Sequence, residues 1–392
     1  MPETPKRTPM MKQYWRFKAD TPDAILFFHL GDFYETFFED AETVARELDI
    51  VLTARNGHPM AGVPVRRGEA YMQQLLAKGY KVAVCQQVED PKQAKGLVKR
   101  EIVRIVTPGT VMEDGLLSAG ANNYLAAVDA ETPDGPFGVA FLDLSTGEFL
   151  HTTAGTEDEL VDELTRRAPS ELLLAHDTER LEELDERFFV TRVPPHSFVL
   201  DPDRPFALGE GESGLRAAGA LRAYVERTQK TSLSHIRRLE AYALSDQMDL
   251  DAFTIASLEL VKPLREGTER GTLLHALDAT VTSMGRRRLR RRILSPLTER
   301  SEIEGRLDAV ELLTGEVLLR QQLREQVGDV HDLERLIGKL GAHRMRPGDL
   351  QALLDSLERI PAIQRGMGSS ASQDALPPKL LTIQRDLSPD EL

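Results

Sequence analysis

An aromatic ring and a carboxylate lie two residues apart near the start of the chain. Phe33 and Glu35 belong to the segment Gly31–Phe37, which directly follows the apolar run Ala24–Phe28. If the Gly-Asp dipeptide turns the chain out of a buried strand, both side chains start the next segment and point to the same side. The ring can then make an apolar contact with a partner, and the carboxylate can accept hydrogen bonds from it. The alternative is that Phe33 belongs to the core and Glu35 is solvated.

Three acidic residues offer a second kind of chemistry. Asp129, Asp143 and Glu148 lie at the ends of three expected strands, over residues 124–128, 137–143 and 147–150. Such a three-stranded start followed by a helix is shared with ribonuclease H-like folds, in which strand carboxylates hold two metal ions. Acidic residues are also common at turns and strand ends. A metal-dependent nuclease is therefore one interpretation. The other is that these acidic residues have only a structural role at turns and strand ends.

Other catalytic signatures are missing from the sequence. The single cysteine, Cys85, lies in an expected strand over residues 80–88, where a small core residue is the simplest role. Gly338-Lys339-Leu340 lacks the upstream glycine and the hydroxyl of a P-loop. Zinc spacing and a serine nucleophile elbow are also absent. We therefore expect no catalytic, cofactor or metal site in these residues.

The length and charge of the chain limit the number of domains and the kinds of partner that can be expected. Its 392 residues predict two or three domains, and no apolar run is long enough to cross a membrane. Because the N-terminus lacks the apolar core of a secretory signal, we expect a cytoplasmic protein. The net charge is −14, yet residues 1–120 hold 16 Lys and Arg against 16 Asp and Glu. Nucleic-acid binding by the first region is therefore not excluded.

The periodicity of apolar residues predicts three regions. The first is mixed α/β, with helices over 8–20, 38–48 and 68–78, strands over 24–28, 50–53 and 80–88, and a turn at Asn56-Gly57. The second is α/β, with the three strands above, strands over 172–175 and 188–190, and helices over 157–166 and 215–229. From residue 244 only helices are expected, over 250–261, 272–277, 285–294, 302–314, 317–327, 332–340 and 347–357, then a flexible stretch over 366–372 and a last helix after Pro377.

Several segments recur together in one protein family. They are Met10–Tyr14, Gly31–Phe37, Pro59–Pro64, Ile105–Thr110 and Leu277–Gly285. By these segments the chain resembles bacterial MutS, the DNA mismatch-recognition protein. The resemblance implies an α/β mismatch-recognition domain (1–118), a ribonuclease H-like α/β connector domain without its active site (119–243), and an incomplete all-helical core or lever domain (244–392).

The resemblance also implies a function and a site. In the family, a Phe-x-Glu pair inserts from the minor groove, so Phe33 would be the wedge and Glu35 the hydrogen-bonding partner of the mispaired base. The implied partner is double-stranded DNA with mismatches or small loops, recognised at the start of mismatch repair. Further contacts to the DNA backbone or groove are expected from residues in neighbouring loops, namely Arg55, Met60, Arg66 and Lys95. At Val65-Arg66 this chain departs from the usual Tyr-His of the family.

More is implied for a full-length family member. Full-length members contain a P-loop ATPase domain later in the sequence, so ATP and Mg²⁺ are the expected cofactors. This chain alone is not expected to hydrolyse ATP. A homodimer, a MutL-type partner and association with the bacterial nucleoid are likewise implied. The chain stops without a compact ending, so we expect it to be an N-terminal fragment.

Within the family, the resemblance leaves a meiotic or recombination paralogue of MutS as an alternative, although such members generally lack the Phe-x-Glu pair. Two alternatives from other classes remain as well. A non-DNA-binding scaffold would place Phe33 in the core, and a ribonuclease H-like nuclease would use the three acids. A separate question concerns the arginine run at residues 286–292, which offers phosphate contacts but covers every face of a helix. We expect a structural role for the run, in which some of the arginines meet acidic neighbours.

Overall fold

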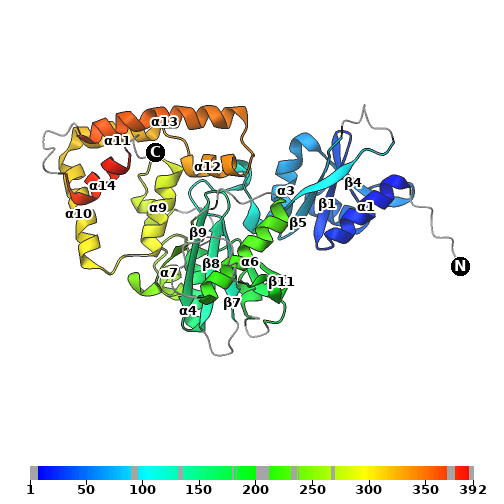
Figure 1. Ribbon diagram of the computed structural model, residues 1–392, viewed down its shortest axis with the longest axis horizontal. Helices are drawn as coiled ribbons and strands as arrows, with labels where there is room; N and C mark the ends of the chain where they lie inside the picture. The colour runs from blue at the N-terminus through cyan, green and yellow to red at the C-terminus, as the bar shows by residue number, and fades with distance from the viewer. Residues whose placement is uncertain are drawn as a thin grey trace.

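Two six-stranded sheets and a helical region make up the chain (Figure 1). The structure is a computed structural model, and the parts of the chain that it describes are residues 8–89, 96–130, 136–178, 181, 183–199, 212–230, 236, 238–265, 270–368 and 376–387. The mixture of two α/β units and a helical part agrees with the multidomain fold predicted from the sequence. Within these residues, no helix combines the length and the apolar character needed to cross a membrane.

The first sheet has the strand order β3-β4-β2-β1-β5-β6. Strands β1 and β5 are parallel, and the other neighbours are antiparallel. A two-residue turn joins β1 to β2, with Gly31 at a φ of 59° that favours glycine. The strands are β1 (Ala24–Leu30), β2 (Phe33–Phe37), β3 (Thr53–Arg55), β4 (His58–Pro64), β5 (Lys81–Gln87) and β6 (Arg100–Val106).

Three helices cover the two faces of this sheet. Helix α1 (Pro9–Asp20) packs with Leu26, Phe28 and Phe37 on one face. Helices α2 (Glu39–Leu48) and α3 (Gly68–Ala77) pack on the other face. Because side chains alternate along a strand, odd-numbered residues of β2 face α1 and even-numbered ones face α2 and α3.

One expected strand of this unit is misplaced. The sequence predicts a strand over residues 50–53, but β3 begins at Thr53. Asp49 ends α2 in the left-handed conformation, with a φ of 51°, and Ile50 packs against the core. The chain therefore reaches the sheet edge only at Thr53, and Val51 and Leu52 are exposed.

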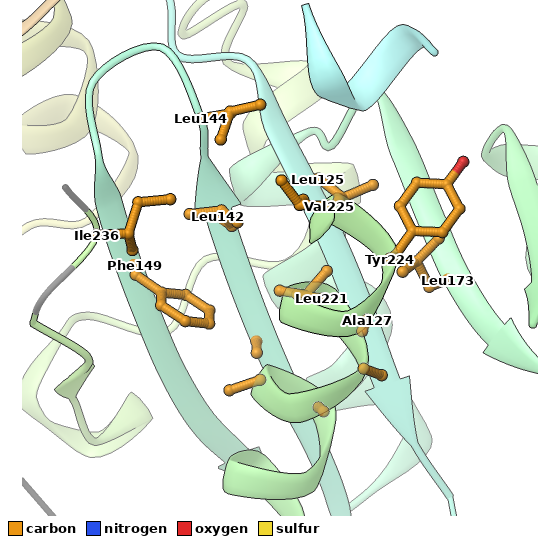
Figure 2. Packing of buried hydrophobic residues seen from close by; sticks show 14 of the residues in the cluster. Leu125, Ala127, Leu142, Leu144, Phe149, Leu173, Leu221, Tyr224, Val225 and Ile236 are labelled. Atoms are coloured by element: carbon orange, nitrogen blue, oxygen red, sulfur yellow. The ribbon is translucent and has the colours of Figure 1, made fainter. Parts of the chain in front are cut away.

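The second sheet has the strand order β11-β10-β7-β8-β9-β12. Its strands are β7 (Tyr124–Asp129), β8 (Phe137–Asp143), β9 (Glu148–Ala154), β10 (Glu171–Ala175), β11 (Val190–Val193) and β12 (Glu240–Ala241). The helices of this unit are α4 (Glu157–Arg167), α5 (Glu183–Arg187) and α6 (Glu212–Gln229). Figure 2 shows Leu221 and Val225 of α6 over the sheet face that carries Leu125 and Leu142. A strand was predicted over residues 188–190, but the observed strand, β11, begins at Val190 and ends at Val193.

A buried carboxylate joins the two sheets. Glu171 of β10 accepts hydrogen bonds from the Thr107 hydroxyl and from the Gly109 amide, the latter at 3.1 Å. Its other oxygen accepts from Thr191 and Tyr224 at 2.7 and 2.6 Å. Gly109 is required here, because a Cβ at this position would lie 2.7 Å from Leu125 Cδ1. The Ile105–Thr110 segment therefore fixes the first unit to the second.

The C-terminal region consists of short and long helices. They are α7 (Ala252–Ser257), α8 (Leu273–Leu277), α9 (Ser283–Leu294), α10 (Arg300–Gly315), α11 (Val317–Gly328), α12 (Leu333–Gly341), α13 (Pro347–Gly368) and α14 (Pro378–Asp386). The described part of the chain also contains short 3-10 helices. They are η1 (Val65–Arg67), η2 (Pro108–Thr110), η3 (Asp114–Leu116), η4 (Pro195–Ser197) and η5 (Leu244–Asp246).

Two predictions for this region need correction. The helix expected over 250–261 is only α7, because Glu259 has a left-handed φ of 46° that ends it early. The helix expected over 347–357 runs on to Gly368 through Pro361. Ile363 and Met367 are buried along this extension, which explains why the helix continues past the proline. The expected flexible stretch is thus helical at residues 366–368, and residues 369–372 lie outside the described part of the chain.

Three arginines of the run on α9 pair with acidic residues, in agreement with the expectation that some of them would. Arg287 is only 3% exposed and donates two 2.7 Å hydrogen bonds to Asp332. Arg291 pairs with Glu148 at 2.5 Å, and Arg286 with Asp278 at 3.3 Å. These arginines attach α9 to its neighbours.

Candidate nucleic-acid interface

Phe33 is an exposed ring at the start of β2. It pairs with Leu30 and Pro64 across the sheet, and 44% of the residue is exposed. The next residue, Tyr34, is 6% exposed and faces the opposite side. Helix α1 covers the Phe37 end of this sheet face and leaves the Phe33 end open. The ring is therefore exposed to solvent at the open end of the sheet face.

Glu35 lies on the same open face and is held by an ion pair. Arg55 Nη1 is 3.2 Å from Glu35 Oε2, with side-chain exposures of 45% and 16%. Opposite Glu35 on β4 is Gly62. A Cβ added at Gly62 would contact both Glu35 Cγ and Phe33 Cδ1 at 3.7 Å. The glycine thus leaves clear the surface on which the ring and the carboxylate meet.

A tight hairpin brings Arg55 to Glu35. Asn56 and Gly57 form the turn between β3 and β4, with φ values of 52° and 81°. Positive φ at both turn residues is typical of the type I′ hairpin that Asn-Gly favours. The sequence predicted this turn correctly, and the turn places Arg55 on β3 opposite His58 of β4.

Tyr34 fixes β2 from the other side of the sheet. Its hydroxyl accepts a 2.5 Å hydrogen bond from Gln86 Nε2, and its ring stacks on Phe27 with centroids 5.6 Å apart. Burial raises the pKa of Tyr34. A Cβ at Gly68 would lie 2.8 Å from the Tyr34 ring, so α3 packs directly on it. This packing limits the motion of the strand that carries Phe33 and Glu35.

A buried acid fixes the far end of the same strand. Asp40 accepts hydrogen bonds from Lys18 Nζ at 2.9 Å, from the Leu26 amide at 3.0 Å and from the Tyr14 hydroxyl at 3.3 Å. The Tyr14 hydroxyl also lies 3.2 Å from the Phe37 carbonyl. Burial, together with the charge of Asp40, raises the pKa of Tyr14 well above its ordinary value. Asp40 thus connects α1, β1 and α2 beneath the end of β2.

The other predicted contact residues are placed differently. Arg66 is exposed in η1, just beyond the Pro64 that pairs with Phe33. Met60 is half-buried and packs against the α1 side of the sheet. Lys95 lies outside the described residues. The structure therefore brings Phe33, Glu35 and Arg55 together, with Arg66 near their edge, and the DNA contacts themselves stay predictions.

Two residues that shape this face, Gly62 and Asp40, were not predicted from the sequence. Gly62 lies within the quoted segment Pro59–Pro64, and its strand position opposite Glu35 was the missing information. Asp40 occupies the first turn of α2, where an acidic residue is ordinary at a helix N-terminus. Its burial was therefore not visible in the sequence.

The nuclease alternative loses its support. Asp129 and Asp143 lie at opposite ends of the paired strands β7 and β8, about 17 Å apart along the strand direction. Asp129 pairs with Arg216 at 2.7 Å, and Glu148 with Arg291. Across the described residues, no group of three or more His, Cys, Asp or Glu side chains is placed to hold a metal ion. These acids have structural partners instead.

Two further expectations concern the core. The scaffold alternative placed Phe33 in the interior, and this is wrong because the ring is 44% exposed. Cys85 is buried on β5, as predicted. Burial raises the pKa of its thiol to about 12, although Arg100 opposes the shift. The thiol is therefore protonated at neutral pH and is no nucleophile.

Comparison with known families agrees with this arrangement. The family models of three consecutive domains match in order: MutS domain I over residues 8–115, MutS domain II over 123–237 and MutS domain III over 253–390. These matches define a multidomain protein built from MutS domains I to III. The chain belongs to the MutS family.

Individual relatives agree over most of the chain. The DNA mismatch repair protein MutS of Syntrophomonas wolfei is 43% identical over 395 residues, which cover 93% of this chain and 46% of the relative. The MutS proteins of Halothermothrix orenii and Geobacillus kaustophilus are 42% and 43% identical, over 92% of this chain in each case and 43% and 41% of the relatives. The chain thus spans less than half the length of these curated relatives.

Proposed function

We propose that this chain recognises mispaired or unpaired bases in duplex DNA at the start of DNA mismatch repair. The observation that carries the proposal is Phe33, a ring 44% exposed at the open end of a sheet face and beside a paired carboxylate. Family membership supports it, because the relatives are DNA mismatch repair proteins.

Phe33 would act as a wedge. A mispaired base stacks poorly, so opening the duplex there costs less than at a matched step, where unstacking costs a few kcal/mol. An inserted aromatic ring recovers about 1–3 kcal/mol of stacking. Discrimination would then arise from the deformability of the DNA and not from a code of base contacts.

Glu35 and Arg55 would adjust that discrimination. A lone carboxylate near phosphates is repelled, and the ion pair with Arg55 reduces this repulsion. Glu35 would accept a hydrogen bond from the displaced base, which is available only at a mismatch. Arg66, Met60 and Lys95 are proposed as further contacts to the backbone or groove.

For the second unit we propose a ribonuclease H-like fold without catalytic function. Three antiparallel strands, β7 to β9, are flanked by β10 parallel to β7, and this arrangement supports the proposal. The paired state of Asp129 and Glu148 argues against metal catalysis.

For the full-length protein we propose further activities and partners. It would use ATP and Mg²⁺ in a P-loop domain outside these residues, form a homodimer, and act with a MutL-type partner at the bacterial nucleoid. These proposals rest on family membership alone.

Binding to a G·T duplex and to its matched twin tests the proposal. Fluorescence anisotropy of labelled oligonucleotides, at a fixed salt concentration, should give at least a several-fold lower Kd for the mismatched duplex and for one with a single unpaired base. Equal affinity for all three would contradict the proposal. Magnesium-dependent cleavage of the oligonucleotide would favour the nuclease instead.

A further inference from the structure

A small cavity at the joint between the second unit and α9 is lined by arginine side chains. It has a volume of about 100 Å³ and lies between the end of α4 and the last turns of α9. The described residues that line it include Tyr124 and five arginines but no Asp or Glu. The arginines are Arg166, Arg167, Arg287, Arg290 and Arg291.

Two of these arginines share a single carboxylate. Glu163 Oε2 accepts from Arg166 Nη1 at 2.6 Å, and Oε1 accepts from Arg167 Nε at 2.8 Å. Glu163 is 1% exposed and Arg166 is 6% exposed, so neither group is compensated by bulk water. Two guanidinium groups against one carboxylate leave positive charge at the cavity wall.

Arg166 also carries an unused donor. Its Nη2 atom lies 3.4 Å from the Leu250 carbonyl, whereas its Nε atom is buried without a hydrogen-bond partner among the described residues. A buried donor left unpaired costs free energy comparable to a lost hydrogen bond. A ligand oxygen in the cavity would satisfy this donor.

On the α9 side, the acidic partners lie outside the cavity lining. Arg291 pairs with Glu148, and Arg287 pairs with Asp332 and Glu334. None of these acids lines the cavity. The described residues that line the cavity therefore carry cationic side chains, and none of them is acidic.

We propose that this cavity binds one tetrahedral oxyanion of the phosphate class. Guanidinium groups match the oxygens of such an anion in geometry and charge. A volume of about 100 Å³ exceeds the space that one ordered water needs, so a small anion can enter the cavity. The bound anion would bridge α4 and α9 and so stiffen the joint between the second unit and the helical region.

A purely structural role makes a different prediction. Both α4 and α9 direct their carboxyl ends toward the cavity, and basic side chains there offset the helix dipoles. If the arginines serve only these dipoles and the buried acids, added phosphate will give no rise in Tm that saturates, only the gradual stabilisation expected of a kosmotropic salt.

Thermal unfolding of the full chain with inorganic phosphate tests the proposal. The Tm should rise with phosphate concentration and then level off, beyond the effect of sodium chloride at equal ionic strength. A phosphorus NMR titration of the same samples measures the Kd directly. A Tm that follows only ionic strength, or that rises with phosphate without levelling off, together with an unchanged phosphate resonance, would overturn the proposal. No DNA is used, so the result is independent of the mismatch site.

Variants on one helix supply the controls. Arg291→Gln should weaken phosphate binding about tenfold or more, as expected for loss of one charge-assisted contact. Arg290→Gln, at a half-buried position, repeats the test if Arg291→Gln does not fold. Arg292→Gln, at an exposed position of α9 outside the cavity, should bind as the wild type does. Equal binding by all three variants would refute the site.

An AMP titration identifies the source of the phosphate group. Binding of AMP with a similar Kd, lost in the same variants, would assign the site to the terminal phosphate of a larger molecule. Exclusion of AMP with retention of inorganic phosphate would assign it to the free anion.

Discussion

Arg55 of β3 reaches across β4 to Glu35 of β2, with 3.2 Å between Arg55 Nη1 and Glu35 Oε2. Along β4, Arg55 pairs with His58 and Glu35 pairs with Gly62, so the ion pair joins two residues at different levels of the sheet. In the free protein, the carboxylate beside the exposed Phe33 ring is therefore already paired. This relationship leads to separate predictions for each of its members.

Glu35→Gln should tighten binding to matched DNA by about 2- to 5-fold, because it removes a repelled charge and releases Arg55 for phosphate. It should also lower the preference for a mismatch. Anisotropy titrations of matched and G·T duplexes give both quantities. Weaker binding of the variant to matched DNA would contradict the repulsion argument.

Arg55→Gln should weaken binding to matched and mismatched duplexes alike, because Glu35 is left without its counter-charge. The slope of log K against log salt should also become shallower by about one unit. Titrations at several salt concentrations measure this slope. In the double variant with Glu35→Gln, most of the loss should be recovered, since no uncompensated carboxylate remains. An unchanged salt slope would show that Arg55 does not contribute to the electrostatics of binding.

Gly62→Leu should reduce DNA affinity without unfolding the protein. A side chain at this position would occupy the surface between Glu35 and Phe33, whereas the Cβ alone makes only ordinary 3.7 Å contacts. Gly62→Ala is therefore the matched control and should bind nearly as the wild type does. Anisotropy and circular dichroism together separate a blocked surface from a misfolded one. Equal binding by the Leu and Ala variants would mean that this face does not meet DNA.

Asp40→Asn should lower the free energy of unfolding of the first unit by about 1–3 kcal/mol, because a buried acceptor of three hydrogen bonds loses its charge. The only tryptophan, Trp15, lies on α1 and reports this unit in urea denaturation. The matched control is Asp23→Asn, whose side chain is 67% exposed in its pair with Lys81. That control should change the stability by less than about 0.5 kcal/mol. Equal effects of both variants would show that Asp40 does not fix α1.

Acid should destabilise the second unit through His151. The residue is 1% exposed, neither ring nitrogen has a partner among the described residues, and burial lowers its pKa. Below about pH 6.5 the unfolded chain binds a proton at this histidine while the folded protein does not, so stability falls as the pH falls. The Tm of the wild type should decline more steeply between pH 7.5 and 5.5 than that of His151→Gln. His275→Gln, at an exposed site, should retain the wild-type slope. Identical slopes for all three proteins would exclude His151 as the cause.

Local pattern was enough to predict much of the fold. The β1–β2 and β3–β4 turns follow from Gly31 and from Asn56-Gly57, whose backbone requirements are visible in the residue types. The extension of α13 through Pro361 could not be predicted, because it depends on the packing of Met367 against residues distant in sequence, such as Leu312 and Leu323.

The site was predicted in part for the same reason. The shared side of Phe33 and Glu35 follows from strand alternation. The Glu35–Arg55 ion pair depends on the order of β2, β4 and β3 in the sheet, which no local pattern contains. The buried role of Asp40 likewise depends on where α1 packs.

The most direct test of the account is the mismatch preference of Phe33→Ala, measured as the ratio of Kd values for matched and G·T duplexes. Loss of about 1–3 kcal/mol of stacking predicts a 5- to 150-fold weaker mismatch complex and a ratio near one. Phe253→Ala, at another exposed phenylalanine, 78% exposed in the helical region, should keep the wild-type ratio. A Phe33→Ala protein that still prefers the G·T duplex as strongly as the wild type would contradict the proposed wedge.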